Sequence, residues 1–178
     1  MMLDSYVWHV LEQKGSKAIW TISPDASVRD AALKMGRKRV GALLVVRAKK
    51  LAGIISEREC VRRVMPQRDR VPSQVRVEEV MQKKVVCVAT TATVEQCFAA
   101  MTFYRTRHVV VVDGRKVVGL VSIGDVVKFV IADQQFAIRQ LEQFICGGMK
   151  PLEPKSWVSW EPGKIQRHDY AAGWLSVA

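Results

Sequence analysis

The sequence predicts an α/β (α+β) fold in which one β-α-β-β-α unit occurs twice, as two pseudo-symmetric copies packed into one module. Residues 20–64 align with residues 86–130 at a constant offset of 66 without any gap, so the repeat is internal to the chain. Within each copy the apolar spacing changes from helical to strand-like and back. Each copy is too short to bury both faces of its own sheet, so the two copies are expected to pack together. The matched pairs include Met35 and Met101, Lys50 and Lys116, Gly53 and Gly119, and Ser56 and Ser122.

Each copy opens with a short extended stretch, AIWTIS in the first and VVCVAT in the second. A helix then begins after Ser27 in the first copy and after Thr93 in the second. Both residue types are preferred N-caps, and an Asp or a Gln follows three residues later, as in a capping box. These signals predict the helix starts in both copies.

The middle of each copy is predicted to be a β-hairpin. The strands VGALLVV and LAGIIS flank the turn RAKK, and the strands RHVVVV and VVGLVS flank the turn DGRK. The Asp-Gly pair is a strong signal for a tight hairpin turn. A second helix is expected to begin at Ser56 in the first copy and at Ser122 in the second.

The order of these elements divides the chain into a first repeat at 7–66, a linker at 67–76, a second repeat at 77–146 and a tail at 147–178. Pro66 and Pro72 mark the linker. The segment VWHVL at the start of the first repeat echoes VEEVM at the start of the second, at an offset of 70. The tail has no predicted role, although its tryptophan content is high for a disordered segment.

The last helix of the second repeat is longer than its counterpart and carries an apolar stripe beyond what one small unit covers. We therefore expect a second helix to cover it, most simply in a homodimer. The stripe consists of Val127, Val130, Ile131, Ile138, Leu141, Phe144 and Ile145.

The formal net charge is +11 and lies entirely within residues 1–150. Basic clusters of this kind indicate either a polyanionic partner or simply a solvated surface. Phosphate is therefore the ligand chemistry to look for. A nucleic-acid binder is the alternative, although no nucleic-acid motif is present and aromatic residues are not interleaved with the basic clusters of the first copy.

Several other classes are disfavoured. No apolar stretch reaches the roughly 20 residues of a membrane helix, and the N-terminus lacks a signal-peptide pattern, so a cytoplasmic protein without a membrane partner is expected. No His or Cys spacing predicts a metal site. No Ser-His-Asp order or second carboxylate supports catalysis, so neither an enzyme nor a catalytic cofactor is expected.

One motif, G-h-h-S-x-x-[D/E] with h apolar, closes each hairpin and opens the next helix. Ser122 at a helix N-terminus presents free N–H groups and a hydroxyl to a phosphate. Asp125, one turn later, is able to accept hydrogen bonds from both hydroxyls of a ribose. Ser56 and Glu59 are the matching pair, for which helix capping is an equally good interpretation.

These motifs, with PDASV…AL…M, KRVGALLVV and RHVVVVDGRKVVGLVSIGDVV, resemble a tandem pair of cystathionine-β-synthase (CBS) domains of the stand-alone bacterial or archaeal type. The similarity covers about residues 7–146. It implies a pseudo-twofold module with two equivalent clefts that hold adenosine compounds such as AMP, ATP, NAD(H) or S-adenosylmethionine. It also implies homodimers, and a regulatory role toward a protein in trans.

The resemblance also implies the rest of the two clefts. The Asp125 cleft would borrow Lys17–Ile19 and Val40–Ala42, with Gly41 and Ala42 bonding an adenine edge through their backbones. The Glu59 cleft would borrow Lys84–Val86 and Thr106–His108. The candidate phosphate partners are Arg39, Arg105 and Arg107, whose alternative role is that of exposed surface arginines.

Three functions remain open: an adenosine-binding sensor, a nucleic-acid binder, and a dimerisation scaffold with degenerate clefts. The sensor is the prediction favoured by the motifs. Within it, the Asp125 cleft is expected to bind more tightly than the Glu59 cleft, because the extra methylene of Glu moves the carboxylate by about 1.5 Å.

Overall fold

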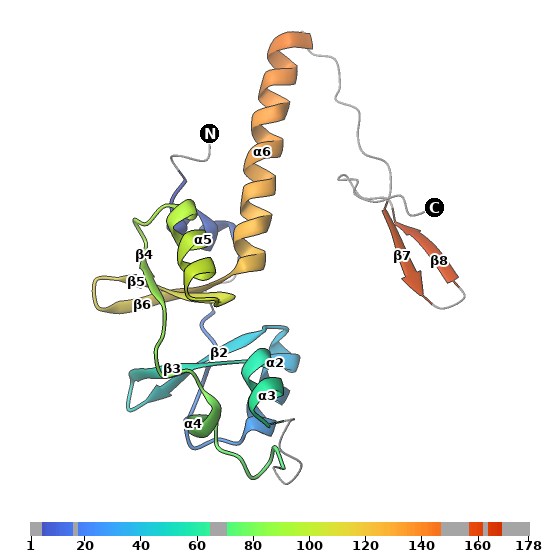
Figure 1. Ribbon diagram of the computed structural model, residues 1–178. Helices are drawn as coiled ribbons and strands as arrows, with labels where there is room; N and C mark the ends of the chain where they lie inside the picture. The colour runs from blue at the N-terminus through green and yellow to red at the C-terminus, as the bar shows by residue number, and fades with distance from the viewer. Residues whose placement is uncertain (1–4, 16–17, 65–70, 147–156, 162–163, 169–178) are drawn as a thin grey trace. The chain divides into compact units, whose positions relative to one another are not determined.

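The computed structural model describes residues 5–15, 18–64, 71–146, 157–161 and 164–168. The chain divides into two compact units, residues 1–133 and residues 134–178. The boundary falls inside the last helix, α6 (Ile123–Cys146). Both copies of the repeat, up to the first turns of that helix, lie in the first unit (Figure 1).

The first copy has the predicted order of elements. These are β1 (Thr21–Ile22), α2 (Val28–Lys38), β2 (Ala42–Arg47), β3 (Lys50–Ser56) and α3 (Glu57–Val64). The three strands form one sheet in the order β1-β2-β3, in which β1 is parallel to β2 and β2 is antiparallel to β3.

The second copy repeats this arrangement with β4 (Cys87–Ala89), α5 (Val94–Phe103), β5 (His108–Asp113), β6 (Lys116–Ser122) and α6. Its sheet has the order β4-β5-β6 with the same directions. The hairpin register is also the same, because Ala42 faces Ser56 and His108 faces Ser122. Both hairpins shift register at the matching point along β2 and β5. The predicted fold class and the offset of 66 are confirmed.

The predicted N-caps are confirmed by hydrogen bonds. Ser27 Oγ accepts the N–H of Asp30 at 3.0 Å, and Thr93 Oγ1 accepts the N–H of Gln96 at 3.1 Å. Gln96 completes a capping box by accepting the N–H of Thr93.

The two short helices that precede the copies exchange places. α4 (Val77–Val80) packs on the first copy, where the N–H of Val77 donates to Ala26 O at 2.9 Å. α1 (Val7–Gln13), at the start of the chain, packs on the second copy, where the N–H of Val7 donates to Ala92 O at 2.9 Å. The division at 7–66 and 77–146 therefore describes the order along the chain, whereas each hydrophobic core is completed by a helix from outside the copy's own β-α-β-β-α elements.

Three clusters of apolar side chains stabilise this unit. One lies under α2, α3 and α4 and includes Met35 and Ile55, and another joins α1 to α5 and includes Val7 and Met101. A third cluster, with Leu44 and Val110 at its centre, takes residues from both sheets. The two copies therefore share a core, as expected for units that cannot bury both sheet faces alone.

In the second unit, the structure describes the end of α6 and a two-stranded antiparallel hairpin, β7 (Trp157–Glu161) and β8 (Lys164–His168). The hairpin falls in the predicted tail at 147–178, whose remaining residues lie outside the described part of the chain. The predicted end of the long helix before Gly147 agrees with the end of α6 at Cys146. Among the described residues, no helix is both long and apolar enough to cross a membrane.

Candidate functional site

The motif at the end of the second copy positions Ser122 and Asp125 through their own hydrogen bonds. Ser122 is the last residue of β6, and Asp125 lies in the first turn of α6. The N–H and the hydroxyl of Ser122 both donate to Asp125 Oδ2 at 2.8 Å, while the N–H of Asp125 donates to Ser122 Oγ at 3.2 Å. This reciprocal pair is a helix cap built with Asp in place of Glu. Capping and ligand binding are therefore compatible at this position.

Lys14, at the C-terminal end of α1, also reaches this carboxylate. Its Nζ lies 2.9 Å from Asp125 Oδ2 and donates to Leu120 O at 2.8 Å. Burial alone raises the pKa of Asp125, but the hydrogen bonds from Lys14 and Ser122 outweigh it and hold the pKa below its ordinary value. Within the described part of the chain, each hydrogen bond to this carboxylate ends on Oδ2, so Oδ1 is left for another donor.

A cavity of about 680 Å³ opens beside this carboxylate. It is walled by α1, by the stretch leading into β1, by the start of β2 and by β6 with the first turns of α6. Its cationic lining consists of Lys14, Lys38, Arg39 and Lys128, against the carboxylates of Glu12 and Asp125. The indole rings of Trp8 and Trp20 also line it, and Lys38 Nζ lies 4.1 Å from the centre of the Trp20 ring. The cavity therefore combines aromatic surface and excess positive charge with the carboxylate of the Asp125 motif.

Most residues predicted for the Asp125 cleft come together at this cavity. Those that line it are Ala18, Ile19, Val40, Gly41, Ala42, Ser122 and Asp125, and the candidate phosphate partner Arg39 lines it as well. Lys17 lies outside the described residues. The carbonyl of Gly41, one of the two predicted adenine contacts, already accepts the N–H of Glu57 at 3.1 Å. His108, predicted for the other cleft, lies here as well, because a side chain at Gly41 would meet its imidazole at 3.4 Å.

His108 is half-buried, and the charges of both carboxylates, Asp125 and Glu59, act on it. Burial lowers its pKa, and Lys14 and Arg107 lower it further, while Asp125 and Glu59 act in the opposite direction. The imidazole is therefore held in its neutral form more strongly than a histidine in water.

Apart from His108, the residues predicted for the Glu59 cleft do not line this cavity, and they have different surroundings. Glu59 Oε2 accepts the hydroxyl of Ser56, and Glu59 Oε1 accepts Nε2 of Gln82 at 2.8 Å. Val86 is the counterpart of Trp20, since the N–H of Val110 donates to Val86 O as the N–H of Leu44 does to Trp20 O. The structural equivalent of Ile19 is thus Val85, one residue earlier than the matching position assigned from the sequence.

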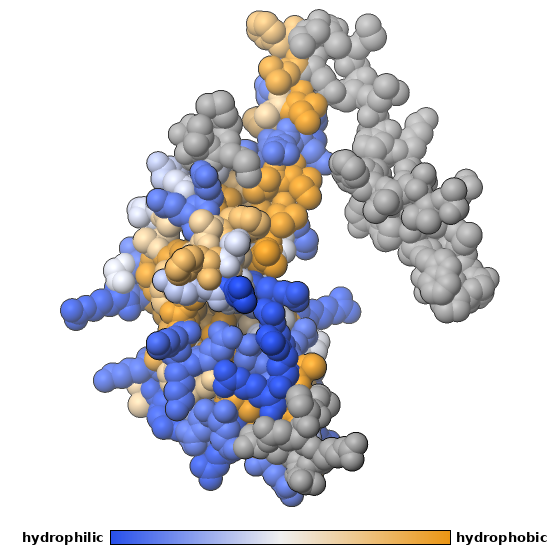
Figure 2. Space-filling model, viewed as in Figure 1, coloured by the Kyte–Doolittle hydropathy of each residue, from blue (hydrophilic) through white to orange (hydrophobic). Residues whose placement is uncertain are grey.

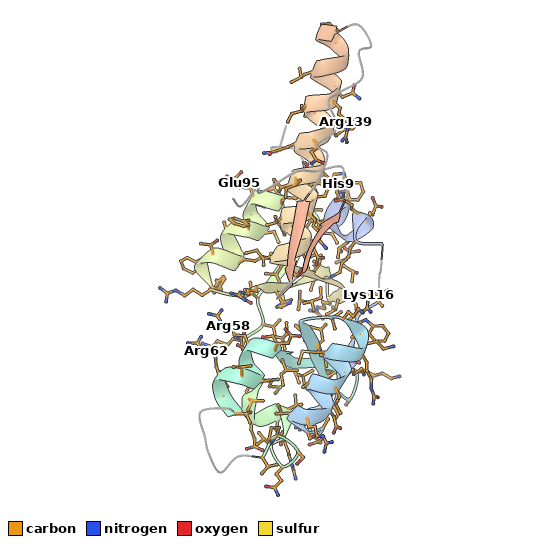
Figure 3. All side chains as sticks on the ribbon, turned by 90° about the vertical axis from the view of Figure 1, so that its right-hand side faces the viewer. His9, Arg58, Arg62, Glu95, Lys116 and Arg139 are labelled. Carbon is orange, nitrogen blue, oxygen red and sulfur yellow. The ribbon has the colours of Figure 1, made fainter. Side chains whose placement is uncertain are left out.

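Arg39 and Arg105 share an unexpected backbone conformation. Their φ angles are 53° and 50°, which place both in the left-handed region just after α2 and α5. Both side chains are exposed, as is that of Arg107. Arg39 lines the cavity, whereas the carbonyl of Arg105 accepts Nη1 of Arg58 at 3.3 Å. Arg58 and Arg62 project outward from α3 on the same side of the molecule (Figure 3).

Sequence reasoning missed Lys14, Lys38 and Lys128, together with Trp8 and Trp20. The matching apolar residues of VWHVL and VEEVM indicate that α1 belongs to the repeated structure and is a candidate to line a site. They do not indicate that α1 packs on the second copy. Figure 3 shows α1, which carries His9, beside the first turns of α6, and the His9 ring lies 6.4 Å from that of Phe129.

A family model described as CBS domain matches the chain twice, at residues 15–66 and at residues 77–132. The chain belongs to the CBS domain family. CBS domain pairs are commonly regulatory modules that bind ligands. The two matched segments correspond to the two copies, so the resemblance found in the motifs is confirmed.

Named relatives and solved structures agree with this assignment. The chain is 34% identical over 148 residues to the mitochondrial CBS domain-containing protein CBSX3 of Arabidopsis thaliana, covering 78% of this chain and 71% of that protein. A candidate signal-transduction protein with CBS domains from Burkholderia ambifaria has 42% identity and a TM-score of 0.70, covering 73% of this chain and 96% of that one. The CBS domain pair of protein MJ0100, solved with 5′-methylthioadenosine and S-adenosylmethionine, has 25% identity and a TM-score of 0.63, covering 72% and 98%.

Proposed function

We propose that this protein is a regulatory module that binds an adenosine phosphate in the Asp125 cavity and acts on a separate partner protein. The observation that carries the proposal is the Asp125 carboxylate, which is ionised, lines a cavity and has an oxygen left to accept ribose hydroxyls. The cavity volume is within the range of about 300–1,000 Å³ for small-molecule sites.

The charge of the lining favours a phosphate-bearing ligand over S-adenosylmethionine. Four cationic side chains face two carboxylates, and the pKa of His108 is lowered, which favours its neutral form. The excess positive charge attracts a nucleotide phosphate, whereas it repels the positively charged sulfonium of S-adenosylmethionine. The MJ0100 pair supports an adenosine ligand in general. The lining of the cavity in this chain is the reason to expect AMP, ATP or NAD(H) to bind more tightly than S-adenosylmethionine.

The aromatic side chains suit the base of the same ligand. Trp8 and Trp20 offer flat apolar surface, and stacking of a base on an aromatic ring contributes about 1–3 kcal/mol. Ala42, the first residue of β2, also lines the cavity, and its backbone is where the resemblance implied a contact with an adenine edge. The proposed role is regulatory and not catalytic, so the regulated activity resides in another chain.

Thermal unfolding against a panel of AMP, ATP, NADH and S-adenosylmethionine tests the proposal. The phosphate-bearing compounds should raise the melting temperature by mass action, and Asp125→Ala should reduce the rise. Charge reversal at Lys49, in the turn between β2 and β3, and at Lys50, the first residue of β3, is the matched control and should leave nucleotide affinity nearly unchanged.

Two other results would reject the proposal. No shift with any adenosine compound would favour a dimerisation scaffold. Binding to DNA or RNA that weakens steeply with salt, without a nucleotide effect, would favour the nucleic-acid binder.

A further inference from the structure

We infer that each chain binds a single adenosine nucleotide, because the side chain of Gln82 occupies the Glu59 cleft as an internal substitute for a ligand. The inference rests on the proposed function and specifies how many of the two clefts are open. The supporting observation is a difference between the two copies of the repeat, which otherwise match: the surroundings of Glu59 differ from those of Asp125.

The first part of the difference is the state of the two carboxylates. Both oxygens of Glu59 have donors from the chain itself, since Ser56 donates to Oε2 and the Gln82 amide donates to Oε1. At Asp125 the donors from the described residues gather on Oδ2. A ribose hydroxyl therefore finds an open acceptor at Asp125 but has to displace the Gln82 amide at Glu59.

The second part is the edge of each sheet. β3 and β6 are matching edge strands of their sheets. On β3, Ile54 and Gln82 exchange both backbone hydrogen bonds, at 2.9 and 3.0 Å. The segment is pressed close to the strand, because a Cβ added at Gly53 would lie 2.7 Å from Gln82 O. The backbone of Gln82 thus holds its side chain over Glu59.

On β6, the matching edge residue is Leu120, and its surroundings are open. Leu120 lines the cavity together with Val118 and Gly119. Within residues 5–15, 18–64 and 71–146, the donor to its carbonyl is the flexible side chain of Lys14. Lys14 also carries a positive charge toward the cavity, whereas the amide of Gln82 is neutral. The edge of β3 is therefore covered by the backbone of Gln82, whereas the edge of β6 lines the cavity, where an anionic ligand has room to bind.

The chemical consequence is selective occupancy. A ribose hydroxyl would replace the Gln82 amide as the donor to Glu59, so the hydrogen bond that is lost offsets most of what the new one would gain. Gln82→Ala removes the amide while keeping the backbone bonds to Ile54. Gln74→Ala, an exposed glutamine before α4, is the matched control.

Isothermal titration with AMP, on the full chain, tests the inference. The unmodified protein should bind about one AMP per chain, and Gln82→Ala should raise this to about two, with Gln74→Ala unchanged. In an Asp125→Ala background, in which the first site is weakened, Gln82→Ala should add a binding site and a further Glu59→Ala should remove that site again. Melting curves establish that each variant is folded.

The outcomes separate the inference from the function on which it rests. Two AMP per chain before any substitution, or still one after Gln82→Ala, overturns the inference and leaves the proposed function standing. No AMP bound by the unmodified protein, when NADH and ATP also fail, overturns both.

Discussion

Asp125 and Glu59 occupy the same position in two copies of one motif, yet their side chains have different partners. The shorter Asp folds back onto the N–H of Ser122 at 2.8 Å and is joined by Lys14. The longer Glu reaches Gln82, in the segment that follows α4. The two side chains differ by one methylene group. The second copy has the cap in which Asp125 bonds Ser122, and the first copy has the hydrogen bond between Glu59 and the Gln82 amide.

Substitution of the two carboxylates should therefore have unequal effects on nucleotide affinity. Asp125→Ala should weaken AMP binding by roughly tenfold to a hundredfold, because each lost hydrogen bond to a charged group contributes about 1.5–3 kcal/mol. Glu59→Ala should change the affinity of the tight site little. Calorimetric titration measures both, and loss of the tight site in Glu59→Ala with its retention in Asp125→Ala would assign the working cleft to the other copy.

His108 should make the stability of the protein depend on pH. Its pKa is lowered from the ordinary value of 6.5, so the unfolded chain binds more protons than the folded one just below that pH. Stability should therefore fall as pH decreases through 6.5 and stop falling below the folded-state pKa, with a slope of at most about 1.4 kcal/mol per pH unit. His108→Gln should reduce this slope in urea midpoints measured between about pH 7.5 and about pH 5. An unchanged slope in the variant would mean that other groups cause the decline.

At the scale of elements, two glycines let the exchanged helices approach the hairpins. Gly53 on β3 meets the segment that follows α4, and Gly119 on β6 meets Leu11 of α1. These positions match at the offset of 66, and the sequence motif contains a glycine at both. The group that approaches Gly119 is the Leu11 side chain.

The two glycines should tolerate alanine differently. At Gly53 the added Cβ would lie 2.7 Å from a backbone oxygen, and Gly53→Ala should cost about 2–3 kcal/mol. At Gly119 it would meet the methyl groups at the end of the Leu11 side chain, which can move more easily than a backbone oxygen, and Gly119→Ala should cost about 1 kcal/mol. Urea unfolding gives both values.

Gly36 is the control for these substitutions. It lies in α2 with nothing within 4 Å of a built Cβ, so Gly36→Ala should stabilise the protein by about 0.5–1 kcal/mol. Equal costs at Gly53 and Gly119 would contradict the distinction between backbone and side-chain contacts.

At the scale of the whole molecule, α6 leaves large apolar side chains uncovered, and they appear as orange atoms along this helix (Figure 2). Val127 and Ile131 are 44% and 49% exposed, and Ile138 and Leu141 are 53% and 62% exposed. Exposed apolar residues three and four positions apart on a helix are typical of a helix that packs against a partner.

We therefore predict a homodimer in which the α6 helices of two chains cover each other. Sedimentation equilibrium at tens of micromolar should give the dimer mass, and Ile138→Glu with Leu141→Glu should shift it to the monomer. Gln140→Glu adds a charge about 200° around the helix from Ile138 and should leave the dimer intact. A monomer before any substitution would show that this surface serves another purpose.

Much of the fold was predictable because it depends on neighbours in the chain. The caps at Ser27 and Thr93, the turns after Arg47 and Asp113, and the end of α6 before Gly147 all follow from local residue preferences. The repeat itself fixed the identical register of the two hairpins. The carboxylate of Asp125 was also identified from its spacing to Ser122, since three residues are one turn of a helix.

Only the tertiary structure decided which helix completes which core and which cleft stays open. Lys14 is 111 positions from Asp125, and Gln82 is 23 positions from Glu59, so no local spacing indicates either contact. The amphipathic pattern of α1 specifies that the helix buries one face, but it contains no information about which of two similar cores receives it. Packing of the whole chain makes that choice, and it brings a lysine to one carboxylate and an amide to the other.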